Sequence, residues 1–351
     1  MNREAVTIRG RAVSLHSSIL NPRFSASTVL CPDPWDYVSL WLQRKHKDKA
    51  GFYWGQARQF YRASTMLPHT ASPLSSYYCF LNATKALLAA RTVSSSKDHG
   101  VTGETDTGRC ALVNELVRFK TGGVLPALCR VLGEGCQSES TYNLKLLFWN
   151  LPFIHRAYTL TYSSASELFL PLEAHGFARK SNSMETWFWG SIQKRYVTAK
   201  TKKTLPAGFE HDGGAGSEWV FRRKKRFNWS GRNLDHSLTE LIEYHRKIRS
   251  YVFPIYATKN RWYLKKSLAE ADKVSHSPLP IIYACMHRLS ELSRYDPQRL
   301  ARHLQLQHNW LLAEFLDCAP AQFIHGIAAE ITGDEFLVPE SFRMERDAST
   351  T

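Results

Sequence analysis

The sequence has 351 residues and carries 46 Lys and Arg against 31 Asp and Glu, which leaves a net charge of +15. Its contents of 43% hydrophobic and 12% aromatic residues exclude an intrinsically disordered chain, and the lack of an apolar window near 18 residues long excludes a transmembrane helix. The positive excess favours nucleic acid or another polyanion as the partner, and a basic surface that serves solubility is the alternative.

The cysteine pattern is typical of a reduced protein. Seven cysteines occur at scattered spacing and include no CxxC pair. Such a pattern predicts buried thiols in place of disulfides or a zinc site. No signal-peptide segment is visible at the N-terminus. We therefore expect a cytoplasmic protein with no metal and no cofactor, and with no membrane attachment.

The first half of the chain has mostly helical patterns. Residues 1–34 show no sustained period and are predicted to form an N-terminal arm, whereas 35–164 is expected to be a helical core. Two helical patterns between residues 57 and 101 are joined by a proline turn. Further helices are predicted at 109–119, at 124–132 and at 142–160, the last interrupted by Pro152.

The second pattern of the helix pair has clear start and packing signals. Ser72 followed by Pro73 is a good helix start, because the hydroxyl can accept an orphan amide bond and proline fits the first turn. Tyr77, Leu81 and Leu88 recur at helical spacing. We expect them to form the buried stripe of this helix.

The second half begins with strand-like sequence. Between 165 and 232, short β-branched and aromatic runs separated by Gly, Pro, Asn and Ser predict a β-rich insertion. A C-terminal helical part, 233–335, is expected to begin with a capping box of Ser237 and Glu240, and 336–351 is predicted to be a tail. The predicted fold class is mainly α, a helical core with a small inserted antiparallel β-sheet.

Several blocks of the sequence resemble the YaaC-like family of bacterial proteins. The blocks are Tyr77, Tyr78, Lys85, Ala86 and Leu87; the dipeptide His99-Gly100; GGVLPAL at 122–128; LPFIHRAY at 151–158; and LSELSRYDP at 289–297. The resemblance extends from about residue 35 to 330. It implies a family but no activity.

The helix pair also resembles the HEPN helical superfamily, many of whose members are ribonucleases with an Arg-x4–6-His motif. The resemblance implies a HEPN-like core, in which an imidazole does acid–base chemistry and an arginine supports the phosphate. Arg302 and His308 have this spacing. Such matches arise readily by chance in a chain rich in Arg and His, so a solvated helix face is the simpler interpretation, and we lean against an enzyme.

Two basic stretches are candidates for nucleic-acid contact. Cationic side chains beside aromatic rings can contact the phosphates and stack on the bases of a single strand. The alternative interpretation of these stretches is an edge strand whose charges block pairing with another sheet. The predicted nucleic-acid-binding residues are Arg222, Arg223, Lys224, Lys225, Arg226, Trp229, Arg246, Lys247 and Arg249.

His99 is a further weak catalytic candidate, because functional residues concentrate on loops. Its ring could instead cap the preceding helix while Gly100 supplies a left-handed backbone angle. The leading hypothesis is a basic bacterial protein that binds single-stranded DNA or RNA, within a defence or stress system. The alternatives are a HEPN-type metal-independent ribonuclease and a non-catalytic scaffold with a protein partner. The sequence leaves the oligomeric state open.

Overall fold

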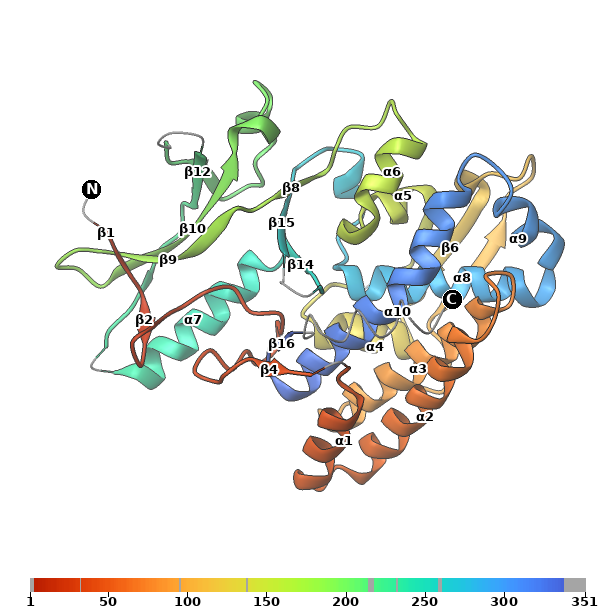
Figure 1. The fold of residues 1–351 in the computed structure, drawn as a ribbon, viewed down its shortest axis with the longest axis horizontal. Helices are drawn as coiled ribbons and strands as arrows, with labels where there is room; N and C mark the ends of the chain where they lie inside the picture. The colour runs from red at the N-terminus through yellow and green to blue at the C-terminus, as the bar shows by residue number, and fades with distance from the viewer. Residues whose placement is uncertain are drawn as a thin grey trace, which may run out of the picture. The chain divides into compact units, whose positions relative to one another are not determined.

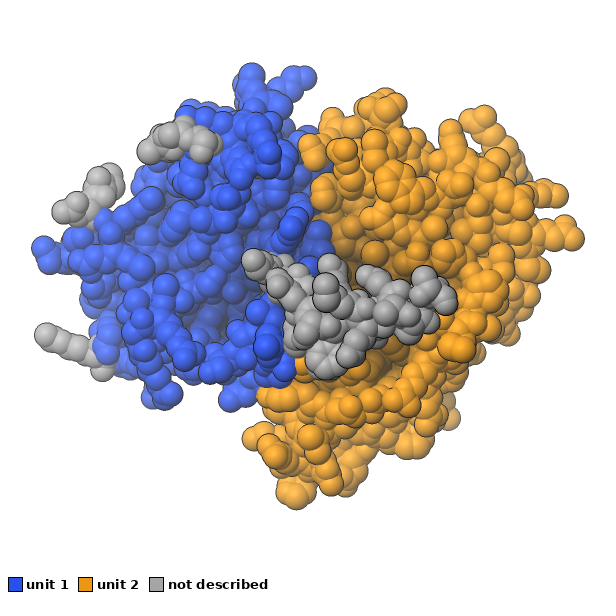
Figure 2. Space-filling model, viewed as in Figure 1, with its two compact units in different colours: residues 1–30, 168–272, 333–337 blue, residues 31–167, 273–332, 338–351 orange. Residues whose placement is uncertain are grey.

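The computed structural model describes residues 3–31, 33–94, 96–136, 138–213, 218–231, 233–257 and 261–337. The chain divides into two units (Figure 2). Unit 1 comprises residues 1–30, 168–272 and 333–337, and unit 2 comprises 31–167, 273–332 and 338–351. Of the predicted tail at 336–351, only Phe336 and Leu337 lie within the described residues.

Unit 1 is built on an antiparallel sheet in the order β1-β9-β10-β12-β11, and β13 also pairs with β10 (Figure 1). The strands are β1 (Arg3–Ala5), β9 (Ala174–Lys180), β10 (Glu185–Gln193), β11 (Phe209–His211), β12 (Glu218–Arg223) and β13 (Phe227–Asn228). β9 and β10 oppose Phe177 to Phe188. β1 pairs with β9 from the start of the chain, which places Arg3 opposite Lys180.

Helix α7 (Leu234–Ile248) packs on this sheet through Leu241, Tyr244 and Ile248, which belong to the same core as the sheet phenylalanines. The Tyr244 hydroxyl accepts a hydrogen bond from the Phe188 amide at 3.2 Å. The helix begins after Asn233, whose side chain caps it. The predicted capping box at Ser237 is therefore wrong, because Ser237 lies inside the helix and donates to the Ser230 carbonyl.

Unit 1 also contains three small sheets within the described residues. They are the hairpin β2 (Thr7–Ile8) with β3 (Arg11–Ala12), the parallel pair β4 (Val29–Leu30) with β16 (Phe336–Leu337), and the sheet β14 (Val252–Ile255), β15 (Arg261–Lys265) and β8 (Phe169–Pro171).

Unit 2 is mainly helical. Its helices are α1 (Trp35–Arg44), α2 (Asp48–Thr65), α3 (Ser72–Ala90), α4 (Val124–Val131), α5 (Leu144–Trp149), α6 (His155–Thr161), α8 (Pro278–Tyr295), α9 (Pro297–His303) and α10 (Asn309–Thr332). Helices α2 and α3 lie side by side (Figure 1). The helix begins at Ser72, with Pro73 in its first turn, as predicted, but the predicted cap by the Ser72 hydroxyl is wrong, because the N-cap residue is Ala71 and no side chain caps the helix. Tyr77, Leu81 and Leu88 are buried as predicted.

A three-stranded sheet lies inside unit 2, with the order β5 (Val101–Thr105), β6 (Glu115–Phe119) and β7 (Ser140–Asn143). The helix predicted at 109–119 is therefore wrong. Side chains along β6 alternate between buried and less buried positions, which is the two-residue period of a strand. The helix predicted at 142–160 is divided into β7, α5 and α6, with a short 3₁₀ turn beginning at Pro152.

The predicted fold class is contradicted. The described residues form five sheets, one of which has six strands, together with ten α-helices. Strands occur in both units, so the chain is an α and β protein and not a helical core with one small inserted sheet. In the described part of the chain, no helix combines the length and apolarity needed to cross a bilayer.

Candidate functional site

A cavity of about 230 Å³ in unit 2 brings together several of the blocks on which the family resemblance rests. It lies between α3, the loop at His99, strand β5 and the C-terminal half of α8. Its polar and aromatic lining residues are Tyr77, Tyr78, His99, Thr102, His287, Ser290, Glu291, Arg294 and Tyr295. The YY pair, the His-Gly dipeptide and the LSELSRY block, far apart in the sequence, therefore line one space.

The His99 loop is positioned by close approach of two glycines. Gly100 and Gly123 both have positive φ, at 79° and 114°. A Cβ on Gly123 would lie 2.5 Å from the Gly100 nitrogen, so a side chain there would separate the two segments. At this contact, the first turn of α4 donates a backbone hydrogen bond to the loop, from the Leu125 amide to the His99 carbonyl at 3.1 Å.

A chain of hydrogen bonds connects His99 with two tyrosines. The Tyr77 hydroxyl is hydrogen-bonded to His99 Nδ1 and lies 3.2 Å from the Tyr283 hydroxyl. The Tyr283 hydroxyl also lies 3.5 Å from the His99 carbonyl, to which it can donate. When Tyr283 donates to that carbonyl, Tyr77 can donate to Tyr283 and accept from Nδ1–H, and this arrangement leaves Nε2 as the unprotonated nitrogen of a neutral, exposed imidazole.

The electrostatics of the cavity favour a neutral histidine beside a cation. Partial burial lowers the pKa of His99, and the charges of Lys85 and Arg294 lower it further against the opposing effect of Asp98. Burial, with His99 and Arg288 nearby, lowers the pKa of His287 to about 3. Arg294 is exposed and forms no ion pair with any described residue. The cavity can thus offer a base and an anion-binding group together.

The sequence candidates Arg302 and His308 do not form such a site. Arg302 is exposed, whereas His308 is buried and lies 2.7 Å from His303 Nδ1. His303 Nε2 in turn lies 2.9 Å from a Glu115 oxygen that is wholly buried. His308 is therefore part of a buried network around Glu115, and the interpretation of the pair as a solvated helix face holds for Arg302 alone.

The cluster at 222–226 lies at the end of β12 and in the turn to β13, and its arginines have internal partners. Arg222 pairs with Glu210 at 2.8 Å and with Asp212 at 3.0 Å. Arg226 pairs with Glu185 at 3.4 Å and lies over the Trp187 ring. Arg223 lies over the Tyr244 ring at 4.7 Å and donates to the Tyr244 carbonyl.

The remaining predicted contacts divide into buried and exposed groups. Trp229 is buried, and so is Arg249, which donates to the carbonyls of His16 and Ser17 at 2.6 Å. The exposed candidates are Lys224, Lys225, Arg246 and Lys247. Neither Lys224 nor Lys225 forms an ion pair with a described residue.

A third basic segment was missed from the sequence. It runs from Lys194 to Lys203 and has exposed cations at Arg195, Lys200, Lys202 and Lys203. The residues that follow it lie beside the 222–226 turn, because the Lys224 amide donates to the Gly208 carbonyl at 2.8 Å. No acidic residue occurs between 186 and 209, and this gap in the charge pattern could have revealed the segment.

The residues of α8 that line the cavity were also not predicted as site residues. His287, Glu291 and Arg294 follow one another at spacings of four and three, so they lie on one side of the helix. Glu291 and Arg294 belong to the family block at 289–297, whereas His287 lies just before it, and polar residues at helical spacing on an otherwise buried helix were a usable signal for all three. Glu291 accepts from the Gly103 amide at 3.1 Å and from Arg288, which ties α8 to β5.

Comparison with known proteins identifies the family of the chain. A family model described as YaaC-like Protein matches residues 24–331, which is most of the chain and confirms the first resemblance. No curated protein and no solved structure matches the chain. The resemblance to HEPN proteins thus has no support from these comparisons.

Proposed function

Because this chain belongs to the YaaC-like protein family and that membership names no activity, we propose a function from its geometry: binding of single-stranded nucleic acid by unit 1, in the cytoplasm. The observation that carries the proposal is the uneven charge of the two units. Unit 1 holds 24 of the 46 Lys and Arg but only 13 of the 31 Asp and Glu. It therefore carries 11 of the 15 excess positive charges.

The contact surface is built from lysines more than from the paired arginines. Lys202 and Lys203 precede the segment at Gly208 that binds the Lys224 backbone, so these exposed cations lie on neighbouring parts of unit 1. Tyr196 is exposed, and its ring contacts the Arg195 guanidinium at 4.8 Å. Cations with an accessible ring suit a flexible strand, which offers both phosphates and unstacked bases.

The test is the salt dependence of binding to a labelled single-stranded oligonucleotide. Replacing Lys224 and Lys225 by alanine removes two phosphate contacts, so the slope of log affinity against log salt should flatten by about 1.4, at roughly 0.7 per contact on single strands. Replacing Arg222 should change affinity less, because its charge is already neutralised by Glu210 and Asp212.

A matched control removes the same charge from unit 2. Lys45 and Lys49 are exposed cations in the turn between α1 and α2 and at the start of α2. The Lys45→Ala, Lys49→Ala protein should keep the parental slope. Equal slopes for both double variants and the parent would exclude the lysine surface of unit 1 as the contact surface for nucleic acid. Failure of the parental protein to bind the oligonucleotide at low salt would exclude it as well.

A second candidate function is metal-independent cleavage of RNA at the His99 cavity, favoured by the neutral His99 beside Arg294. His99 Nε2 would take the proton of a ribose 2′-hydroxyl, whose oxygen attacks the phosphorus while the bond to the 5′-oxygen breaks. The products are a 2′,3′-cyclic phosphate and a 5′-hydroxyl, which recovers the proton from the imidazolium. Arg294 would offset the charge on the phosphate.

Cleavage is tested in EDTA on an oligonucleotide with a single ribonucleotide, beside its all-deoxy counterpart. We expect a cyclic phosphate product only from the former, and we expect it to be lost in His99→Ala and kept in His69→Ala, a histidine paired with Asp317 elsewhere in unit 2. Since the base acts when neutral and its pKa is lowered, activity should fall only at pH below 6.5. Undiminished cleavage by folded His99→Ala protein would refute this assignment.

A further inference from the structure

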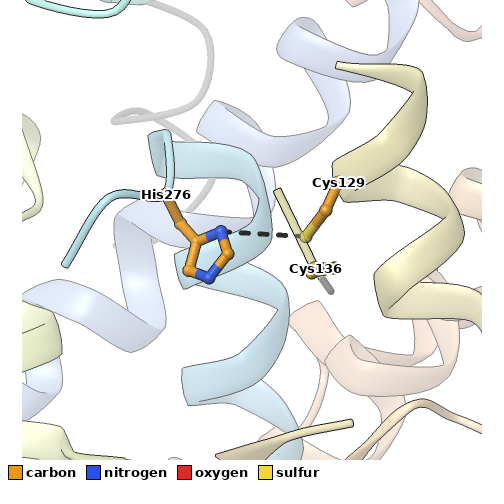
Figure 3. A group of neighbouring side chains, drawn as sticks. All are labelled: Cys129, Cys136 and His276. Atoms are coloured by element: carbon orange, nitrogen blue, oxygen red, sulfur yellow. Dashed lines mark hydrogen bonds between the residues drawn. The ribbon is translucent and has the colours of Figure 1, made fainter. Parts of the chain in front are cut away.

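Two cysteines and a histidine from distant parts of unit 2 converge on one point. The ligand atoms of Cys129, Cys136 and His276 all lie within 4.8 Å of one another, and Figure 3 shows the His276 ring facing the Cys129 sulfur. Cys129 and His276 are buried, and Cys136 is partly buried. Thiolate sulfur with imidazole nitrogen is the donor set that selects zinc.

Local structure explains how the two cysteines meet. Cys129 lies near the end of α4, and the chain reverses at Gly133, whose φ is 78°. The Glu134 amide donates to the Cys129 carbonyl at 2.8 Å and the Gly133 amide to the Arg130 carbonyl at 3.1 Å, which is the hydrogen-bond pattern of a Schellman motif. Because the chain turns back at Gly133, Cys136 lies next to Cys129.

The histidine is held in a fixed orientation. Its ring stacks on Phe119 of β6 at 4.7 Å with an interplanar angle of 7°. Its Nδ1 atom lies 3.9 Å from the Cys129 sulfur and 3.0 Å from a Glu134 oxygen. With zinc–sulfur and zinc–nitrogen bonds of about 2.3 and 2.0 Å, tetrahedral sulfur and nitrogen ligands lie about 3.5 Å apart. A movement of a few tenths of an ångström would therefore bring His276 Nδ1 and the Cys129 sulfur to the separation that zinc requires.

We propose that Cys129, Cys136 and His276 bind one zinc ion through Sγ, Sγ and Nδ1, and that the carboxylate of Glu134, which lies 3.0 Å from His276 Nδ1 but outside the group of three, moves in as the fourth ligand. Binding releases the two thiol protons to solvent and involves no change of oxidation state. Glu134 is already placed by the Ser277 amide, which donates to its other oxygen at 3.0 Å. The four donors would complete a closed, tetrahedral site of the structural kind.

The position of the site indicates what zinc would do. Ser277 is the residue before α8, and α8 carries His287 and Arg294 of the cavity. The opposite end of α4 donates its first amides to the loop of His99. Zinc would therefore fasten the end of α4 to the start of α8 and stabilise the two elements that hold the cavity.

The experiment measures zinc in the full-length protein purified under reducing conditions, then repeats the measurement after chelation and titration with zinc or cobalt. We expect one zinc per chain, a thiolate-to-cobalt charge-transfer band, and a melting temperature that falls on chelation and recovers with zinc. Cys136→Ser should weaken zinc binding by more than about 100-fold, beyond the loss of an outer-shell partner.

Two further variants test the zinc site even if a cysteine or histidine variant folds poorly. Cys318→Ser, a partly buried cysteine of α10, should keep the parental affinity. Glu134→Gln leaves the thiols and His276 in place and should lower the affinity by at least about 10-fold. Three outcomes would each overturn the zinc site. They are a Cys129–Cys136 disulfide in protein purified under reducing conditions, the absence of a cobalt band, and parental zinc affinity in folded Cys136→Ser protein.

Discussion

At the scale of single residues, the most demanding feature of unit 2 is the buried carboxylate of Glu115. Arg288 binds one of its oxygens at 2.7 Å, and His303 and Arg299 bind the other. Burial alone would raise the pKa of Glu115, but these hydrogen bonds outweigh burial and lower it to about 2. A carboxylate wholly removed from water is tolerated here because cationic or hydrogen-bonding groups meet both of its oxygens.

We predict that Glu115→Gln lowers the free energy of unfolding by about 3–5 kcal/mol at pH 7, since it removes the carboxylate partner of the partly buried Arg299 and one of the two carboxylates that pair with the buried Arg288. Denaturant titration measures the loss. The control is Glu104→Ala on β5, which pairs with Arg118 at 3.6 Å at the surface and should cost less than about 1 kcal/mol. Comparable losses from the two changes would contradict the special role of Glu115.

The same carboxylate predicts a pH dependence. Its pKa is lower in the folded chain than its usual value of 4.5, so the stability it contributes is fully present above pH 4.5 and is lost as the pH falls toward 2. Between those values, the stability of Glu115→Gln should decline less steeply than that of the parent. Parallel declines, measured by denaturant titration at each pH, would show that the carboxylate does not titrate in this range.

At the scale of elements, helix α3 shows where sequence signals succeed. Its start at Ser72-Pro73 and its apolar spacing are local features, and both are confirmed. Strand β6 shows where they fail, because ELVRF has enough helix-forming residues to be predicted as a helix. Its pairing with β5 and β7 overrides that propensity.

We predict that Leu81→Ala in α3 lowers the free energy of unfolding by about 2–5 kcal/mol, because it removes buried apolar surface and leaves a cavity. Leu81 is 5% exposed. Leu160 of α6 is the matched control, since it is 52% exposed and its replacement by alanine should change stability by about 0.5 kcal/mol or less. A Leu81→Ala protein as stable as the parent would show that α3 is not part of the core.

At the scale of the whole molecule, both units are assembled from separate stretches of the chain. Arg3–Ala5 pairs with β9, and Val29–Leu30 pairs with Phe336–Leu337 near the other end of the described chain. The division of charge follows this assembly, since unit 1 combines the basic N-terminal residues with the basic segment 168–272. A charge count over the whole chain therefore hides the contrast between the units.

The sequence by itself determined the features that depend on near neighbours. These are the start of α3, the helix at 124–132, the break at Pro152 and the family blocks. Periodicity, capping and proline geometry act over a few residues, so a single sequence carries them. The excess of positive charge is of the same kind, because it needs no knowledge of the fold.

Only the tertiary structure decided which distant groups meet. It paired Arg222 and Arg226 with Glu185, Glu210 and Asp212, which changed the expected contact surface from arginines to lysines. It also placed His99 against Tyr283, and His276 against Cys129. The last two contacts join residues more than a hundred positions apart, and the ion pairs depend on which strands lie side by side, so no local signal specifies either.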